Sequence, residues 1–346
     1  MKKLLLLLLL LFVTLIGYSQ QTLNESILHN NLQRDYIIHI PSSYSVNDPI
    51  PLVFCFHGYG STANTIMSYT SFNYISDTAG FIVVYPQGTL LQGTTHWNVG
   101  GWTLGSNMDD VGFISSLLDS LSNQYNIDET RVYSTGMSNG GYMSFLLACQ
   151  LSDRIAAIAS VTGSMTPQTY NLCNPQHPMP ILQIHATTDQ TVPYFGDPLW
   201  TESINNVLQY WVDYNNCNTS PIIISIADIN PSDNSTVERL TWKNGDNSVV
   251  TDHLKVIGGG HDWFGVWGNM DIHSSAEIWK FFSTYDINGL IGNSTFIAEL
   301  TTNDNYLVKI TDVLGREIEK PSNSPLFYIY NDGTVEKKII LEKLNL

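Results

Sequence analysis

The chain has 346 residues, of which 43% are hydrophobic and 13% are charged, and its formal net charge is −16. This length suits one large domain, or one large domain with a small one. The acidic balance argues against nucleic acid and anionic membrane surfaces as partners, because the long-range field of the protein would repel both.

The N-terminus has the pattern of an export signal. Lys2 and Lys3 precede an apolar run over residues 4–17, and Gly17-Tyr18-Ser19 provides a small-x-small cleavage site. This pattern predicts a cleaved signal peptide over residues 1–19, and therefore a secreted protein. No later segment is long and apolar enough to span a bilayer, so we expect no transmembrane span in the mature protein.

Short apolar runs then alternate with segments of helical period. The runs predict strands over residues 35–40, 51–56, 81–85, 131–135, 155–160, 181–185 and 253–257. The intervening segments predict helices over residues 110–121, 139–151, 201–214 and 275–282. Such alternation indicates an α/β fold with a mostly parallel central sheet flanked by helices, in which ligands bind at the carboxyl ends of the strands.

The composition changes near residue 285. From residue 288 onward the chain is rich in Asn, Thr and short β-type runs, with turn signals at Leu314-Gly315 and Asn331-Asp332-Gly333. We therefore predict a main domain over residues 20–287 and a small β-rich domain over residues 288–346.

A candidate nucleophile follows the fourth of these predicted strands. Gly136-Met137-Ser138-Asn139-Gly140 forms a G-x-S-x-G pattern between that strand and the next helix. A tight strand-to-helix turn requires glycines beside the serine and exposes its hydroxyl above the sheet. In this context the pattern predicts that Ser138 is the nucleophile of a serine hydrolase.

The partners of such a serine follow in the chain order acid, then histidine. Asp189 comes shortly after the predicted strand at residues 181–185, and His261 follows the glycines that end the strand at residues 253–257. We predict that His261 is the general base and that Asp189 orients it. A turn or capping role for Asp189, and a solvent-facing role for His261, are the structural alternatives.

Two backbone amides are candidates for stabilising the oxyanion. The amide of Asn139 directly follows the nucleophile, and the turn His57-Gly58-Tyr59-Gly60 follows an early strand. In hydrolases of this type one donor comes from each of these places. We therefore predict that the amides of Tyr59 and Asn139 form the oxyanion hole.

Taken together, the motifs resemble the feruloyl esterase and polyhydroxybutyrate depolymerase-like group of carbohydrate esterase family 1. The matching stretches are residues 56–60, 84–88, 97–98, 109–113, 136–141, 185–194, 259–261 and 278–282. The resemblance implies an α/β-hydrolase fold and a serine carboxylic-ester hydrolase that needs no metal or cofactor. It implies as substrates feruloylated or acetylated xylan, or a polyhydroxyalkanoate-type polyester. The histidine loop departs from the group, because Asp262-Trp263-Phe264 stands where Thr-Trp-Pro is frequent.

The tail resembles the C-terminal sorting domain of the type IX secretion system. Residues 310–317 and 328–338 carry this likeness. It implies the secretion machinery as a partner, and export through the periplasm to the outside or to the cell surface. A carbohydrate-binding β module is the alternative for this tail.

Aromatic residues and cysteines complete the candidate site residues. Trp97, Trp102 and Trp263 lie near the predicted site in the chain, and their rings could stack on a sugar or phenolic group, although core packing would explain them equally well. From the predicted topology we expect a disulfide between Cys173 and Cys217 at the amino-end face of the sheet.

Two other functions are compatible with this pattern. Because fold does not determine which bond is cleaved, the same residues could form a serine peptidase. A catalytically inactive surface adhesin could also retain the scaffold, although the complete Ser, Asp and His set argues against it.

Overall fold

The computed structural model describes residues 20–292, 307–311, 325–330 and 335–339. The predicted signal peptide lies outside these residues. The chain divides into two compact units, residues 1–291 and 292–346, whereas the composition places the boundary between residues 287 and 288.

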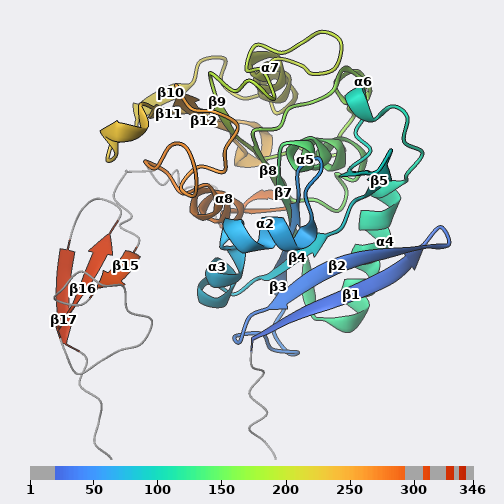
Figure 1. The fold of residues 1–346 in the computed structure, drawn as a ribbon, viewed down its shortest axis with the longest axis horizontal. Coiled ribbons are helices and arrows are strands. Elements are labelled where there is room, and N and C mark those ends of the chain that lie inside the picture. Colours follow the sequence, from blue (N-terminus) through green and yellow to red (C-terminus); the bar gives the residue numbers. More distant parts are fainter. Residues whose placement is uncertain (1–19, 293–306, 312–324, 331–334, 340–346) are drawn as a thin grey trace, which may run out of the picture. The chain divides into compact units, whose positions relative to one another are not determined.

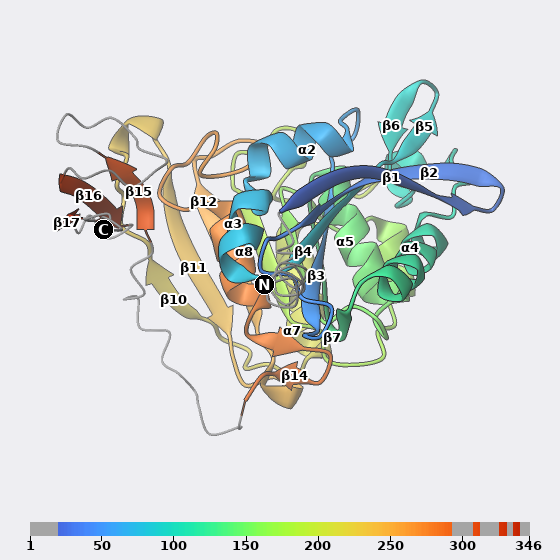
Figure 2. The same cartoon turned by 90° about the horizontal axis from the view of Figure 1, so that it is seen from below.

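A ten-stranded sheet forms the centre of the first unit, in the order β1-β2-β4-β3-β7-β8-β9-β12-β11-β10. Its strands are β1 (Gln21–His29), β2 (Leu32–Ile40), β3 (Ile50–Phe56), β4 (Ile82–Pro86), β7 (Ile127–Met137), β8 (Ala157–Val161), β9 (Ile181–Ala186), β10 (Ile222–Ser225), β11 (Thr236–Trp242) and β12 (Thr251–Ile257). The six strands from β4 to β12 in this order are parallel, and two antiparallel strands extend the sheet at each edge (Figures 1 and 2).

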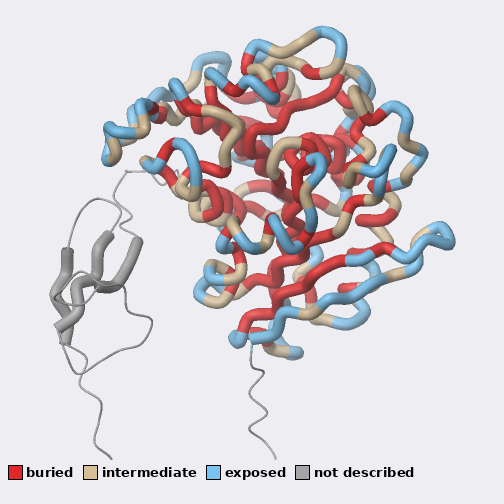
Figure 3. The backbone as a smooth tube through the Cα atoms, viewed as in Figure 1, coloured by how far each residue is buried: buried red, intermediate tan, exposed pale blue. Residues whose placement is uncertain are grey.

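Helices cover both faces of this sheet. They are α2 (Ala63–Thr70), α3 (Phe72–Ala79), α4 (Asp110–Gln124), α5 (Asn139–Gln150), α6 (Pro167–Leu172), α7 (Ile204–Tyr214) and α8 (Ser274–Phe282). Alternate residues of the strands belong to two separate hydrophobic clusters, one shared with α4, α5 and α7, and the other with α2, α3 and α8. The central strands are therefore buried on both faces (Figure 3), which is why they read as continuous apolar runs.

The seven predicted strands and four predicted helices all form, with ends that shift by a few residues. The predicted α/β architecture with a mostly parallel sheet is confirmed. The edge strands β1, β10 and β11 were not predicted. β1 is mostly polar and solvent-exposed, β10 has only four residues, and charged residues interrupt the apolar positions of β11. The hairpin of β5 (Thr89–Leu91) and β6 (Thr94–His96) was also missed, since its strands have three residues each.

The predicted Cys173–Cys217 disulfide is wrong. Cys149, at the end of α5, is bonded to Cys173, with an S–S distance of 1.98 Å, and Cys217 is a buried free thiol. The physical reason is the unpredicted helix α6, which begins at the capping residue Thr166 and packs on α5, so that Cys173 follows it beside the end of α5. Cys217 is instead close to Gly245 in the loop before β12.

The small strands β13 (Tyr285–Asp286) and β14 (Gly289–Leu290) close the first unit. In the second unit β15 (Leu307–Thr311), β16 (Pro325–Tyr330) and β17 (Val335–Ile339) form an antiparallel sheet. The residues that resemble a sorting domain lie partly outside the described residues, so that assignment stays a prediction. Within the described part of the chain, no helix has the length and apolar character needed to cross a membrane.

Candidate active site

Ser138 lies in a sharp turn between β7 and α5. Its backbone has φ 55° and ψ −120°, a region that residues with a side chain rarely adopt. Glycines make the turn possible, because a Cβ on Gly136 would lie 2.6 Å from the carbonyl oxygen of Phe56, and one on Gly140 would lie 2.1 Å from the same oxygen. The backbone strain therefore presents the partly exposed Ser138 side chain at the carboxyl end of β7.

Asp189 and His261 meet at the same edge of the sheet. They follow β9 and β12, which are parallel to β7, so all three residues come after carboxyl ends of strands. The Nδ1 atom of His261 lies 2.8 Å from Oδ2 of Asp189. The Asp189 side chain is fully buried, whereas 19% of the His261 side chain is exposed. The geometry thus pairs an oriented imidazole with a carboxylate that solvent does not reach.

The ionised form of Asp189 is strongly supported. Its Oδ1 accepts hydrogen bonds from the amides of Thr191 (2.8 Å) and Val192 (2.9 Å). Burial raises the pKa of Asp189, but the hydrogen bond and charge of His261 and the Val192 amide outweigh it, and the net pKa lies below its ordinary value. An ionised Asp189 accepts a hydrogen bond from the Nδ1–H group of His261, which leaves Nε2 as the basic nitrogen of this ring.

A second histidine, His185, is fully buried and contacts Asp189 as well. His185 donates from Nε2 to the carbonyl oxygen of Val192 at 2.9 Å, and the same nitrogen is 3.5 Å from Oδ2 of Asp189. Its Nδ1 accepts a hydrogen bond from the side-chain Nε2 of Gln183 at 3.0 Å. Burial lowers the pKa of His185, despite the nearby Asp189 charge, so the ring is neutral. Gln183, a polar residue two places earlier in a buried strand, is the one sequence signal of this network.

The two predicted oxyanion donors belong to the two segments next to Ser138, namely the start of α5 and the turn after β3. Asn139 is the first residue of α5, where the amides have no acceptor within the helix. Gly58, the neighbour of Tyr59, is so close that a Cβ on it would lie 3.5 Å from Cβ of Ser138. Among the residues that the structure describes, no hydrogen bond uses the Tyr59 amide. Both amides are thus available beside the serine, and their role stays a prediction.

The predicted substrate contacts of two tryptophans are wrong. Trp97 and Trp263 have no exposed surface, because their rings pack in the two hydrophobic clusters. Trp102 is partly exposed and packs against Trp200, with ring centroids 5.3 Å apart. Two other aromatic rings in loops after strands are more accessible, namely Tyr59 (45% exposed) and Trp267 (48% exposed).

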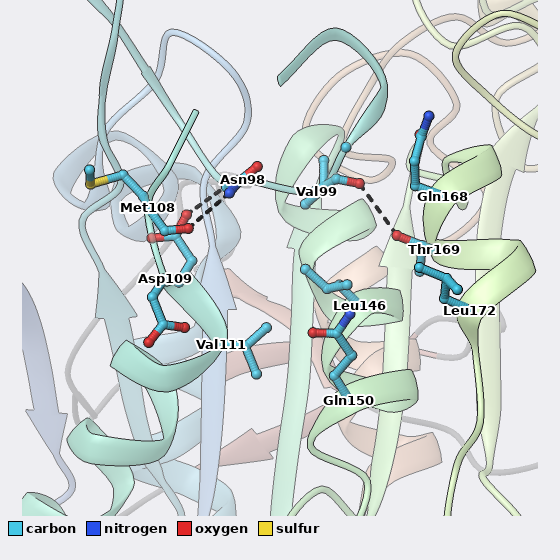
Figure 4. Close-up of a pocket in the computed structure, with 12 residues that line it drawn as sticks. Asn98, Val99, Met108, Asp109, Val111, Leu146, Gln150, Gln168, Thr169 and Leu172 are labelled. Atoms are coloured by element: carbon cyan, nitrogen blue, oxygen red, sulfur yellow. Dashed lines mark hydrogen bonds between the residues drawn. The ribbon is translucent and has the colours of Figure 1, made fainter. Parts of the chain in front are cut away.

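A cavity of about 230 Å³ lies away from this triad (Figure 4). Its lining includes Asn98, Asp109, Gln168 and, on α5, Leu146 and Gln150. Because a helix rises about 1.5 Å per residue, Leu146 is roughly 10 Å along α5 from its first residue, Asn139. The cavity therefore does not contain the reacting groups. Across the described residues, no three His, Cys, Asp or Glu side chains are grouped as a metal site requires.

Comparisons with known proteins show that the chain is similar to esterases. Residues 34–174 match the family model described as esterase PHB depolymerase. A bifunctional acetylxylan esterase/xylanase of Neocallimastix patriciarum is 28% identical over 274 residues, which are 79% of this chain and 36% of that protein. Feruloyl esterase B of Piromyces equi is 26% identical over 238 residues, which are 66% of this chain and 42% of that protein. The chain thus spans well under half the length of these relatives.

Superposition on a solved structure identifies the fold. The acetyl xylan esterase from Aspergillus awamori superposes with a TM-score of 0.54 and 16% identity, covering 77% of this chain and 99% of that one. The chain adopts the α/β-hydrolase fold. Ser138, Asp189 and His261 follow β7, β9 and β12, and a serine, an acid and a histidine occur in this chain order in the fold. The predicted likeness to feruloyl esterases and polyhydroxybutyrate depolymerases is confirmed as well.

Proposed function

We propose that the first unit is a serine carboxylic-ester hydrolase in which Ser138 is the nucleophile, His261 the general base and Asp189 the orienting acid. The observation that supports this most is the 2.8 Å contact between His261 and the buried Asp189, at the sheet edge where the strained turn presents Ser138. Burial of the Asp189 carboxylate and the strained backbone at Ser138 both cost stability, which supports a functional role for these residues.

The reaction proceeds in two acyl-transfer steps. Nε2 of His261 takes the proton of the Ser138 hydroxyl while its oxygen attacks the ester carbonyl, and the amides of Tyr59 and Asn139 stabilise the resulting oxyanion. The carbonyl re-forms as the alcohol leaves with the proton from Nε2. Water then attacks the acyl-enzyme in the same manner and releases the acid. Asp189 stabilises the imidazolium that forms in each step and remains ionised throughout.

For the substrate we propose an ester carried on a polysaccharide, either a feruloyl or an acetyl group on xylan. The names of two relatives, an acetylxylan esterase/xylanase and a feruloyl esterase, support this class. The exposed rings of Tyr59 and Trp267 and the partly exposed ring of Trp102 offer flat surfaces to a sugar or phenolic group. A polyhydroxyalkanoate-type polyester is the second class, which the matched family model supports.

Parallel release assays test the substrate class. The full chain is incubated with feruloylated arabinoxylan, acetylxylan, polyhydroxybutyrate and a peptide p-nitroanilide, and the released acids and amine are quantified. The proposal expects release of ferulate or acetate at rates well above release from the other two substrates. Release from polyhydroxybutyrate alone would reassign the enzyme to polyesters, and cleavage of the anilide alone would make it a peptidase.

We further propose that the enzyme acts outside the cell. The proposal rests on the pattern of residues 1–19 and on the likeness of the tail to a secretion sorting domain. Expression in the native host, followed by mass spectrometry of the culture fluid and washed cells, tests it. A protein found only in the cytoplasm with Met1 retained would contradict it.

A further inference from the structure

We propose that Trp97 is a positioning residue that holds both backbone donors of the oxyanion hole in place. Trp97 follows β6 and belongs to neither of the segments that provide the donors. Its side chain has no exposed surface. The inference rests on the proposed function and adds the residue that connects the two halves of the site.

The first connection is to Asn139. The backbone amide of Trp97 donates to Oδ1 of Asn139 at 2.7 Å, and Nδ2 of Asn139 donates to the carbonyl oxygen of Trp97 at 3.1 Å. The backbone N–H and C=O of Trp97 therefore form a pair of hydrogen bonds with the side-chain amide of Asn139. Asn139 is fully buried, so water does not replace either bond. This pair holds the first residue of α5, whose own amide is one of the two donors.

The second connection is to the turn after β3. The indole Nε1 of Trp97 donates to the carbonyl oxygen of His57 at 3.0 Å. The indole also packs against the rings of Phe56 and His57, each with a centroid distance of 5.1 Å. The turn that leads to Tyr59 is thus attached to Trp97 by one directed hydrogen bond and by packing on both residues before Gly58.

His57 extends this attachment to the next peptide group. Its Nε2 accepts from the amide of Gly88 at 2.9 Å, so the ring proton is on Nδ1, which donates to the carbonyl oxygen of Gly58 at 2.8 Å. Burial lowers the pKa of His57 to about 4, so this neutral tautomer persists at neutral pH. The carbonyl groups of His57 and Gly58 both have partners as a result.

The direction of the Tyr59 amide follows from these bonds. In a planar trans peptide the N–H points opposite to the preceding carbonyl. Since the carbonyl of Gly58 is held by the His57 ring, the N–H of Tyr59 is directed away from that ring and has no partner in the described residues. Trp97 therefore aligns one donor through Asn139 and the other through His57, before any substrate is present.

The replacement Trp97→Phe tests this inference, with Trp211→Phe as the matched control. Both tryptophans are fully buried in the same hydrophobic cluster, but Nε1 of Trp211 has no hydrogen-bond partner in the described part of the chain. Both changes remove similar apolar volume, and only the first removes a bond to the site. Small displacements of catalytic groups cost up to about 100-fold in rate, so we expect kcat of Trp97→Phe to fall about 10- to 100-fold.

The remaining readouts separate positioning from general destabilisation. KM for p-nitrophenyl acetate should change little in Trp97→Phe, and its affinity for a trifluoromethyl ketone, whose serine adduct carries an oxyanion, should fall in parallel with kcat. In Trp211→Phe, kcat and this affinity should stay within about twofold of wild type, since only packing is lost. Thermal melts of both variants report the shared effect on stability.

Equal kcat values for the two variants would overturn the role of Trp97. If Trp97→Phe does not fold, site-specific replacement of Trp97 by 3-benzothienylalanine keeps the two-ring shape and removes only the N–H, and wild-type kcat in that protein would overturn it as well. A Ser138→Ala protein serves as the zero reference. Its retention of activity would refute the proposed function itself, which is a different result from equal kcat values.

Discussion

On the β3 side of Ser138 the groups held in place are peptide bonds, whereas on the β9 side they are ionisable side chains. The first side presents the amides of Tyr59 and Asn139, and the second presents the Asp189 and His261 pair. A buried, neutral histidine supports each side. His57 carries its proton on Nδ1 and orients a peptide group, and His185 carries its proton on Nε2 and lies beside a carboxylate.

The two sides should therefore control different properties of the reaction. Peptide amides do not titrate, so the oxyanion side should set the limiting rate without altering its pH dependence. The Asp189 and His261 pair does exchange protons, so changes there should affect both the rate and its pH profile. The variants below break one side at a time.

The largest effect is expected from Asp189→Asn. An amide cannot stabilise the imidazolium of His261 and permits the wrong tautomer, so kcat should fall by about 10³- to 10⁴-fold. Steady-state hydrolysis of p-nitrophenyl acetate checks this. Asp119→Asn is the control, because Asp119 is 62% exposed and its ion pair in the described residues is with Arg154, so its kcat should equal that of wild type. A loss of less than tenfold in Asp189→Asn would exclude Asp189 as the orienting acid.

An intermediate effect is expected from His57→Phe. The change keeps a ring of similar shape but removes the Nδ1–H group that donates to the carbonyl oxygen of Gly58. We therefore expect kcat to fall about 10- to 100-fold. The pH profile should keep its shape, since the acid and base are untouched. His177→Phe is the control, because His177 bonds to the carbonyls of Pro178 and Ser152, which lie away from the site. A shifted profile with an unchanged limiting rate would place His57 on the acid–base side instead.

The smallest effect is expected on the pH dependence of the free energy of unfolding. Burial lowers the pKa of His57 to about 4 and that of His253 to about 3. As the pH falls below about 6.5, the unfolded chain binds protons that the folded chain does not, so the free energy of unfolding decreases down to about pH 4. His57 alone should contribute roughly 2–3 kcal/mol of this loss between pH 7 and 4.5. The lowered pKa of Asp189 adds a further loss only at lower pH.

Urea unfolding of wild type and His57→Phe at pH 7 and pH 4.5 measures this contribution. The free energy of unfolding of the variant should decrease less between the two pH values, because one buried neutral histidine is gone. Equal decreases in the two proteins would show that His57 does not resist protonation in the folded state. The comparison uses differences within each protein, so the packing cost of the replacement cancels.

The features that the sequence predicted best depend on local patterns. Strands such as β3 and β9 are buried on both faces and therefore appear as continuous apolar runs. Ser138, Asp189 and His261 could each be named because each follows such a run in a loop or tight turn. Parallel strands bring their carboxyl ends to one edge of the sheet, so the topology predicts where these residues lie.

The features that could not be predicted depend on contacts between distant segments. Trp97 is read equally well as a stacking platform or a core residue, and only its bonds to His57 and Asn139 distinguish these roles. The pairing of Cys149 with Cys173 depended on a six-residue helix that has no clear periodicity. Edge strands such as β1 were missed, because half-exposed polar residues hide their pairing.

The central claim is that Ser138 performs nucleophilic attack, and the hydrolysis rate of Ser138→Ala tests it most directly. Purified variant and wild type are assayed on the same ester, with folding of both verified by circular dichroism. The variant should retain at most about one part in 10³ of the wild-type rate. A folded Ser138→Ala protein that hydrolyses the ester faster than this would contradict the account.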